Sequence, residues 1–323
     1  MPSNNAVLFL RAQTAVHPGV GTSVGATDLP VQRERYTQWP NIQGSAVKGV
    51  LREAYRMHLI RTQPDTFKKG DGDDAQSARD KANNSDELKA IFGADVNAGD
   101  HAGAVAVTDA RILAFPIRSA KGVFAWVTCK GVLARFADDM KMAQLGLNTS
   151  LSSGPTNELA GVTDEGYKNL FVDTLNPARL VLEDLIFQRH DASTPLATST
   201  KAILEHAGAD DAGRRVVVLS DDAFTHIVRY CTEVTTRIAL DYDTKRVKDG
   251  ALFVLEMLPT ETILYSVLLV SAIRDGKLNG KLTQKDVAPK IQSSLGSPGL
   301  LQIGGEETTG KGWCWAKIYR EAS

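Results

Sequence analysis

The chain has 323 residues, and 37 Lys and Arg stand against 38 Asp and Glu, so its formal net charge is −1 at neutral pH. This length suits one large domain or two small ones, and the near-neutral balance excludes a chain that attracts nucleic acid over its whole surface. No run of eighteen apolar residues occurs, no signal peptide is visible, and three scattered cysteines form no CxxC pair. We therefore expect a cytoplasmic protein with no membrane partner, disulfide framework or thiolate zinc site.

The first hundred residues predict a strand, a helix and a polar insertion. Residues 6–15 are β-branched and aromatic enough for a first strand. Residues 45–61 place apolar side chains at helical spacing, with Ser45 as the expected N-cap. Residues 62–103 are rich in Gly, Asp and Lys, which predicts a mobile insertion that contains one short helix at 85–92.

From residue 104 onward the sequence has the pattern of strands separated by a few helices. Strands are expected at 104–118, 122–130, 179–189, 216–219, 234–240, 251–258, 262–273, 300–303 and 313–319. Helices are expected at 131–145, 220–230 and 284–295, with a linker at 148–157 and an irregular or partly helical connection at 192–212. Because no regular βαβα alternation occurs, we predict one α+β domain over residues 1–323, with helices on one face of its sheet.

Residues 15–61 combine a glycine-rich loop with a local excess of positive charge. Gly19, Gly21 and Gly25 precede one acid, Asp28. Between residues 29 and 61 six cations stand against two Glu, a local charge of +4; the cations are Arg33, Arg35, Lys48, Arg52, Arg56 and Arg61. Free backbone N–H groups, a cationic helix start and an isolated carboxylate together predict a site for a phosphate ester.

Asp28 has two interpretations. An Asp just before Leu-Pro is commonly a turn residue. In the company of glycines and cations, it could instead hold one hydrated metal ion beside a phosphate or accept the proton of a ribose 2′-hydroxyl. His17 lies in the same segment and is either a second acid or base or a structural residue.

A second glycine loop lies at residues 304–312. Its sequence GGEETTGKG nearly matches the phosphate-binding P-loop, but position 312 is Gly where a metal-binding hydroxyl is required. The following WCWAKIY alternates like a strand, whereas a P-loop opens a helix, so a nucleotide site is not expected. The loop is either a plain turn or a contact for an RNA backbone through its N–H groups and Lys311.

A long hairpin with a charged tip is expected between residues 234 and 258. Arg237 on this hairpin could reach a nucleic acid strand, or the charges could only keep an exposed hairpin soluble. The chain has no G-x-S-x-G or H-E-x-x-H motif that would indicate a hydrolase triad or a zinc protease.

Several of these segments match one family in combination. The chain contains His17-Pro-Gly-Val-Gly, Thr27-Asp-Leu-Pro, Pro40-Asn-Ile-Gln-Gly-Ser-Ala-Val-Lys-Gly, the run 109–129, Leu258-Pro-Thr-Glu-Thr and the glycine loop 304–312. Together, and nearly end to end, they resemble the backbone subunit of type III-B (Cmr) CRISPR effector complexes, a member of the RAMP superfamily.

The resemblance implies a modified ferredoxin-like (RRM-type) fold with a palm, fingers formed by the 62–103 insertion, and a thumb β-hairpin at about 234–258. It implies a filament of copies on a guide crRNA, together with other CRISPR effector subunits. Complementary single-stranded target RNA would be cut at regular intervals with a divalent metal ion, Mg or Mn. Asp28 would be the catalytic residue and a possible metal ligand.

The resemblance also implies a set of RNA-binding residues, and the chain departs from the family's pattern in one segment. Lys48 matches the family's guide-binding lysine. With the cations and glycine loop above, the expected RNA-binding residues are Lys48, Arg33, Arg35, Ser45, Arg52, Arg237, Gly304, Gly305, Thr308, Thr309, Gly310 and Lys311. Where an acidic pair and a tyrosine are expected, the chain has Leu255-Glu-Met257, so only Glu256 and His17 remain as possible accessory residues.

Three other functions are weighed against an RNA-guided endoribonuclease. A non-catalytic guide-binding scaffold would tolerate loss of Asp28. A guide-processing endonuclease would need an essential histidine, and an NTPase would need Lys311 to bind nucleotide.

Overall fold

The structure is a computed structural model that describes residues 4–21, 27–67, 75–94, 102–147, 154–156, 158–241, 243, 244, 246–274, 278 and 281–321. Its strands are β1 Ala6–Ala12, β2 Asn41–Ile42, β3 Val105–Val107, β4 Ala110–Arg118, β5 Phe124–Cys129, β6 Leu159–Val162, β7 Phe171–Val172, β8 Arg179–Leu182, β9 Leu185–Arg189, β10 Val216–Leu219, β11 Glu233–Leu240, β12 Val247–Met257, β13 Ile263–Val270, β14 Leu300–Gln302 and β15 Trp313–Tyr319. Its α-helices are α1 Gly44–Thr62, α2 Pro64–Phe67, α3 Ala75–Asn83, α4 Asp86–Phe92, α5 Lys130–Ala143, α6 Asp164–Leu170, α7 Thr194–His206, α8 Ala212–Arg215, α9 Asp221–Tyr230 and α10 Gln284–Ser294. The mixed α/β class agrees with the prediction.

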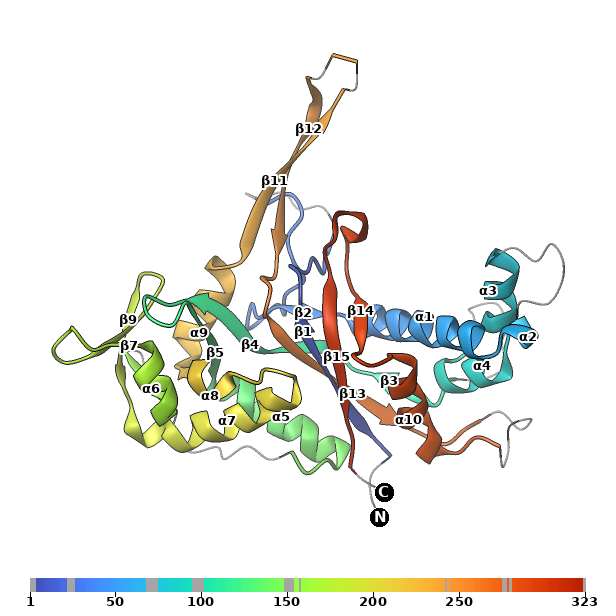
Figure 1. Ribbon diagram of the computed structural model, residues 1–323, viewed down its shortest axis with the longest axis horizontal. Helices are drawn as coiled ribbons and strands as arrows, with labels where there is room; N and C mark the ends of the chain where they lie inside the picture. The colour runs from blue at the N-terminus through green and yellow to red at the C-terminus, as the bar shows by residue number, and fades with distance from the viewer. Residues whose placement is uncertain are drawn as a thin grey trace.

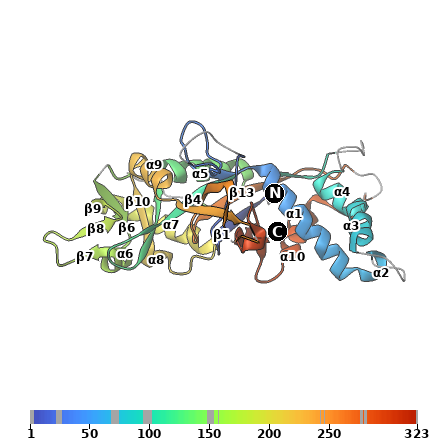
Figure 2. The same cartoon turned by 90° about the horizontal axis from the view of Figure 1, so that it is seen from above.

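One long sheet runs through the molecule. Its order is β14-β15-β1-β13-β4-β5-β10-β6-β9-β8-β7, with β2 added beside β4 and β3 beside β13. The two ends of the molecule are built differently, with α1 to α4 at one end and β7 to β9 with α6 at the other (Figures 1 and 2). The glycine loop therefore joins β14 and β15 at one edge of this sheet.

Helices pack on both faces of the sheet, so the prediction of helices on one face is wrong. On β1, Val7 and Phe9 belong to one hydrophobic cluster with Phe136 of α5. The alternate residues Leu8 and Leu10 belong to a second cluster, which contains the buried face of α1. The reason is visible in β1 itself, because a strand that is apolar at nearly every position can bury both faces.

Helix α1 begins one residue before the expected cap. Gln43 is the N-cap and its side chain makes no capping hydrogen bond, so the prediction that Ser45 is the N-cap is wrong. Instead, the Gly44 N–H donates to Oδ1 of Asp109, at 2.7 Å. A Cβ at position 44 would lie 2.5 Å from the carbonyl oxygen of Val107, so the helix start fits against this strand only as glycine.

The polar insertion is helical and packed wherever the structure describes it. Arg52 of α1 donates to the carbonyl of Gly93 at 2.6 Å and to Asn83 at 3.0 Å. Tyr55 of α1 donates to Glu87 of α4. The insertion thus contains α2, α3 and α4 and not only the one short helix expected, its mobility stays a prediction, and residues 68–74 and 95–101 lie outside the described residues.

One other predicted element needs correction. The single strand expected at 179–189 is two strands, β8 and β9, because Glu183 has a φ of +46° and turns the chain back. The connection at 192–212, expected to be irregular or partly helical, contains the thirteen-residue helix α7. Most of the expected linker at 148–157 lies outside the described residues.

Strands β11 and β12 form the hairpin that we call the thumb. They pair in antiparallel register from Glu233↔Met257 to Ile238↔Leu252, and the pair makes a sheet of its own. The thumb projects from the middle of the molecule, away from both termini (Figure 1). No helix within the described ranges is long and apolar enough to cross a membrane.

Candidate functional site

The segment that carries Asp28 docks against the base of the thumb at two places. We call residues 16–31 the Asp28 loop. At its start, Val16 and Leu258 exchange two backbone hydrogen bonds of 2.9 and 2.8 Å. At its end, the Leu29 N–H donates to Val254 at 3.1 Å, and the Glu256 N–H donates to Leu29 at 3.0 Å. Both limbs of the loop are thus fastened to β12 and its extension.

The Asp28 carboxylate is oriented by the backbone of β12. Its Oδ2 accepts a hydrogen bond from the Val254 N–H, at 2.7 Å. The side chain is half-buried, and no other donor to it is found among the residues that the structure describes. Oδ2 is therefore held by β12, while Oδ1 has no partner within the part of the chain that the structure describes.

His17 lies in the opposite limb of the same loop and is buried. Its Nδ1 is 2.7 Å from the Glu256 carbonyl oxygen, which only accepts, so Nδ1 donates and the other ring nitrogen, Nε2, takes no part in this bond. A Cβ at Gly19 would lie 2.6 Å from that Nε2. This geometry gives His17 a structural hydrogen bond through Nδ1; an accessory catalytic role stays a prediction.

Glu256 and Arg33 form a nearly buried ion pair beneath the loop. Arg33 Nη2 is 2.6 Å from Oε1 of Glu256, and its Nη1 donates to the carbonyls of Gln38 and Val228 at 2.9 and 2.8 Å. The other oxygen of Glu256 accepts from the Val31 N–H at 3.0 Å. The Arg33 guanidinium thus has three acceptors within the chain, and its RNA contact stays a prediction that this arrangement does not favour.

The second cation of this run, Arg35, is exposed in the turn between residues 34 and 39. The neighbouring Glu34 is fixed by Arg135, which donates to both of its oxygens, at 2.9 and 2.5 Å. Burial raises the pKa of Glu34, but hydrogen bonds from Arg135 and Thr37 outweigh burial and lower it overall. The turn is therefore anchored while Arg35 faces solvent.

The glycine loop, residues 304–312, docks on the start of the Asp28 loop. The Gly305 N–H donates to the His17 carbonyl at 3.1 Å, and the Gly312 N–H donates to Ala15 at 2.9 Å. Gly304 has a φ of +90°, and a Cβ there would lie 2.4 Å from the carbonyl oxygen of His17. This glycine is required by both conformation and space. The strand β15 follows, as the sequence predicts, and not the helix of a P-loop.

The thumb also touches the glycine loop. Arg237 of β11 is 2.9 Å from Oε2 of Glu306 and 3.4 Å from Oγ1 of Thr309. Thr308 and Gly310 are exposed, and Lys311 is partly exposed. The loop thus presents polar groups and cations to solvent at the point where the thumb leaves the body.

The three remaining predicted RNA contacts, Ser45, Lys48 and Arg52, lie on α1 and do not take part in the thumb-base contacts described above. Lys48 lines a pocket of about 590 Å³ with the α4–β3 connection and with residues after β13, including Arg274. Burial lowers the pKa of Lys48, and the neighbouring charge of Arg52 lowers it further. Arg52 itself is bound to the insertion, while Ser45 is exposed in the first turn.

The acidic residues do not gather as a resident metal site. Within the described part of the chain, no three His, Cys, Asp or Glu side chains are grouped so that they could hold an ion. Near Asp28, the carboxylate of Glu256 is occupied by Val31, Arg33 and Thr232. Asp28 therefore offers one ligand, and phosphate oxygens and water would have to complete the coordination of a divalent ion.

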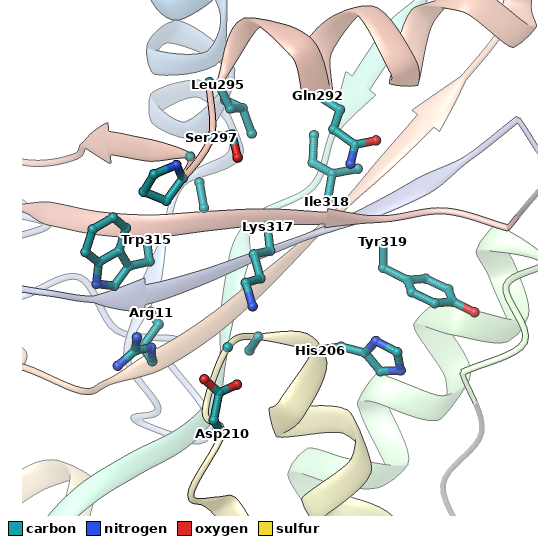
Figure 3. A pocket seen from close by; sticks show the side chains of 16 residues that line it. Arg11, His206, Asp210, Gln292, Leu295, Ser297, Trp315, Lys317, Ile318 and Tyr319 are labelled. Atoms are coloured by element: carbon teal, nitrogen blue, oxygen red, sulfur yellow. The ribbon is translucent and has the colours of Figure 1, made fainter.

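A separate pocket of about 480 Å³ lies where β1 and β15 pass between the ends of α7 and α10 (Figure 3). Arg11, Asp210 and Lys317 line it, and Arg11 is paired with Glu261 at 2.9 Å. None of the residues singled out in the sequence lines this pocket. The convergence of predicted residues at the thumb base, and not pocket size, identifies the candidate site.

Two contacts that position the site were not expected from the sequence. Asp109 caps α1, and the Val254 N–H binds Asp28. An acid close to the helix start along the chain would signal the first contact, but Asp109 is 65 positions away from Gly44. No side-chain signal exists for the second, because every non-proline residue carries the same donor.

Comparisons with known proteins agree on one family. The model of the RAMP superfamily matches residues 9–315. The CRISPR system Cmr endoribonuclease Cmr4 of Pyrococcus furiosus is 33% identical over 306 residues, covering 93% of this chain and 90% of that protein. A curated CMR subunit Cmr4 of Saccharolobus solfataricus is 23% identical over 326 residues, covering 94% and 93%.

Solved structures agree in fold. The crystal structure of oligomeric Cmr4 from Pyrococcus furiosus has a TM-score of 0.66 and 26% identity, covering 99% of both chains. A chain of a type III-B Cmr-beta complex bound to cognate target RNA has a TM-score of 0.64 at 21% identity, covering 97% and 96%, and shows the fold alone. Sequence, fold and the segments gathered at the thumb base thus lead to one conclusion: the chain belongs to the RAMP superfamily and, within it, to the Cmr4 endoribonuclease family of type III-B CRISPR effector subunits.

Proposed function

We propose that this chain is the backbone subunit that cuts target RNA in a type III-B CRISPR effector complex, with Asp28 as its catalytic carboxylate. The observation that carries the proposal is the position of Asp28, whose Oδ2 is fixed on the thumb base by the Val254 N–H while Oδ1 has no donor among the described residues. The endoribonuclease name of the relative at 33% identity supports the activity.

The chemistry requires little from the protein besides geometry and proton transfer. In RNA, the 2′-hydroxyl attacks the adjacent phosphorus, a bond to that phosphorus forms, and the bond from phosphorus to the 5′-oxygen of the next nucleotide breaks. A proton leaves the 2′-oxygen and another is supplied to the departing 5′-oxygen. Asp28 is suited to accept the first proton or to orient the nucleophile. Nε2 of His17 and the ammonium of Lys311 are the candidates at the leaving side.

A divalent ion, Mg or Mn, remains part of the proposal. When bound, it would offset negative charge that develops on the phosphate. Asp28 would hold it with one oxygen, beside phosphate and water ligands, because the nearby carboxylate of Glu256 is engaged by Arg33 and Val31.

The proposed partners are a guide crRNA, complementary single-stranded target RNA, further copies of this chain and the other effector subunits, all in the cytoplasm. Cmr4 of Pyrococcus furiosus crystallises as an oligomer, which supports the self-association. Exposed Arg35, Thr308 and Lys48 on its pocket wall are the proposed RNA contacts outside the catalytic loop.

The experiment is cleavage of a guide-complementary RNA by the assembled complex, with wild-type chain and with Asp28→Ala. We expect regularly spaced products from the wild type and a loss of about 100- to 10,000-fold in rate for the variant. Binding of the target should persist, because pairing with the guide supplies it. Unchanged cutting by Asp28→Ala would assign the chain to the scaffold function and the active site to another subunit.

A further inference from the structure

We propose that Glu256 is a positioning residue for RNA cleavage: it joins both limbs of the Asp28 loop to the thumb and acts through Asp28, not as an acid or base. This inference rests on the proposed function of Asp28. It also gives Arg33, expected from its charge to bind RNA, a role as the partner of Glu256.

Residue 256 makes contacts with four separate segments. Its backbone N–H and carbonyl bind Leu29 and His17, one in each limb of the loop. Its carboxylate binds the Val31 N–H at the end of the loop, Arg33 beyond it, and the hydroxyl of Thr232 at 2.8 Å at the start of the thumb. A single residue of β12 therefore links the loop, the turn that follows it and the thumb.

The carboxylate is placed for this task and not for contact with RNA. Its side chain is 9% exposed, and three donors share its two oxygens. Asp28 shows the opposite arrangement, because it is half-buried and accepts one hydrogen bond. Asp28 thus has an oxygen without a donor among the described residues, whereas the carboxylate of Glu256 is committed to the protein.

The coupling to Asp28 runs through a short stretch of chain. Asp28 precedes Leu29, which pairs with β12, and Val31, whose N–H is held by Glu256. In Glu256→Gln one of the two oxygens becomes an NH2 donor, so the positions that now accept from Val31 and from Arg33 cannot both accept, and the guanidinium of Arg33 is left without its counter-charge. Because reacting groups must be held to within a fraction of an ångström, a displacement of about 1 Å costs as much as 100-fold in rate.

The test compares complexes that carry Glu256→Gln, Arg33→Gln or Glu261→Gln with the wild type, on a guide-complementary RNA. Glu261 is the matched control, since it pairs with Arg11 and lies outside the thumb base contacts. We expect Glu256→Gln and Arg33→Gln to lower the single-turnover rate by about 10- to 100-fold. Glu261→Gln should cut at the wild-type rate.

Two further readouts separate positioning from other roles. Target affinity and its dependence on salt should stay unchanged in all three variants, whereas a lost phosphate contact would lower affinity and flatten the salt dependence. The pH–rate profile of Glu256→Gln should keep its shape while the rate is lower at every pH. Removal of a general acid or base would instead abolish the fall in rate on one side of the pH optimum. Circular dichroism on each purified variant establishes that it is folded.

The outcomes distinguish this inference from the proposed function. If Asp28→Ala abolishes cutting while Glu256→Gln cuts at the wild-type rate, the positioning role is wrong and the nuclease assignment stands. A changed profile shape in Glu256→Gln would make Glu256 a catalytic residue and also contradict the inference. If Asp28→Ala cuts normally, the proposed function itself fails.

Discussion

Two Arg–Glu ion pairs join the thumb base to neighbouring loops, and they differ in exposure. The side chains of Arg33 and Glu256 are 15% and 9% exposed, whereas those of Arg237 and Glu306 are 28% and 26% exposed. The first pair also holds backbone groups on both sides, while the second adds only the Thr309 hydroxyl. The comparison teaches that the charge of an arginine does not by itself distinguish a structural ion pair from a side chain that could contact RNA.

The physical reason is the cost of removing a charge from water. When a buried ion loses its partner, water cannot take the partner's place. Breaking a buried pair therefore costs far more folding free energy than breaking an exposed one. The Arg237–Glu306 pair at the glycine loop is exposed to water, and a phosphate could replace Glu306 beside Arg237. We therefore interpret the Arg33–Glu256 pair as structural, while an RNA contact of Arg237 stays a prediction that its exposure allows.

The largest expected effect comes from breaking the buried pair. In Arg33→Ala, Glu256 stays buried without a cation, and the carbonyls of Gln38 and Val228 lose their donor. We expect the free energy of unfolding to fall by about 3 kcal/mol. Urea unfolding of the isolated chain measures this, with Arg237→Ala as the matched control at less than about 1 kcal/mol. Equal losses in the two variants would remove the distinction between the pairs.

A smaller effect is expected where the glycine loop meets the Asp28 loop. Gly304 and Gly310 both have positive φ, so Ala at either position costs roughly 1 kcal/mol in conformational strain. Of these two positions, only at Gly304 would the new Cβ also overlap a backbone atom, the carbonyl oxygen of His17, whereas a Cβ at Gly310 would meet no atom of the described residues within 4 Å.

We therefore expect Gly304→Ala to slow target cleavage by about tenfold through displacement of the His17 limb. Gly310→Ala should leave the rate close to that of the wild type. Single-turnover cleavage by the two complexes checks this, and equal rates would mean that the contact between the loops does not set the geometry of the site.

The smallest effect is expected from Glu306→Gln. The exposed pair with Arg237 is lost at a cost of about 0.5 kcal/mol or less. Removing a negative charge beside Arg237 should strengthen target binding by about two- to threefold at low salt, and the gain should vanish at high salt. Titration of target RNA at two salt concentrations measures it. Weaker binding by this variant would show that Glu306 itself serves the RNA surface.

The sequence identifies the segments of the candidate site better than their contacts. The glycines, Asp28 and His17 are recognisable because their residue types have uncommon conformational or chemical properties. The partner of Arg33 is not recognisable, because Glu256 lies 223 positions away and only the fold brings it there. For the same reason, the positive charge of Arg33 predicts an RNA contact, which stays a prediction, and gives no sign of the ion pair with Glu256.

Local patterns also predict the elements unevenly. The thumb and α10 follow from alternation and helical periodicity and are formed close to the expected bounds. The cap of α1 does not follow, because the residue that satisfies the helix start, Asp109, is supplied by tertiary structure. Helices on both faces of the sheet could be expected from β1, which is apolar at nearly every position. The prediction of helices on one face rests instead on the small number of helices between the expected strands.

The most direct measurement compares four complexes on one target RNA: wild type, Asp28→Asn, Glu256→Gln and the double variant. Asn keeps the shape of Asp28 and an oxygen that can accept from Val254, so its effect reports the lost charge. If Glu256 serves cleavage only by placing Asp28, the double variant should cut no more slowly than Asp28→Asn alone. If the two losses multiply, Glu256 acts independently of Asp28, and the thumb base is not the frame of a single catalytic loop.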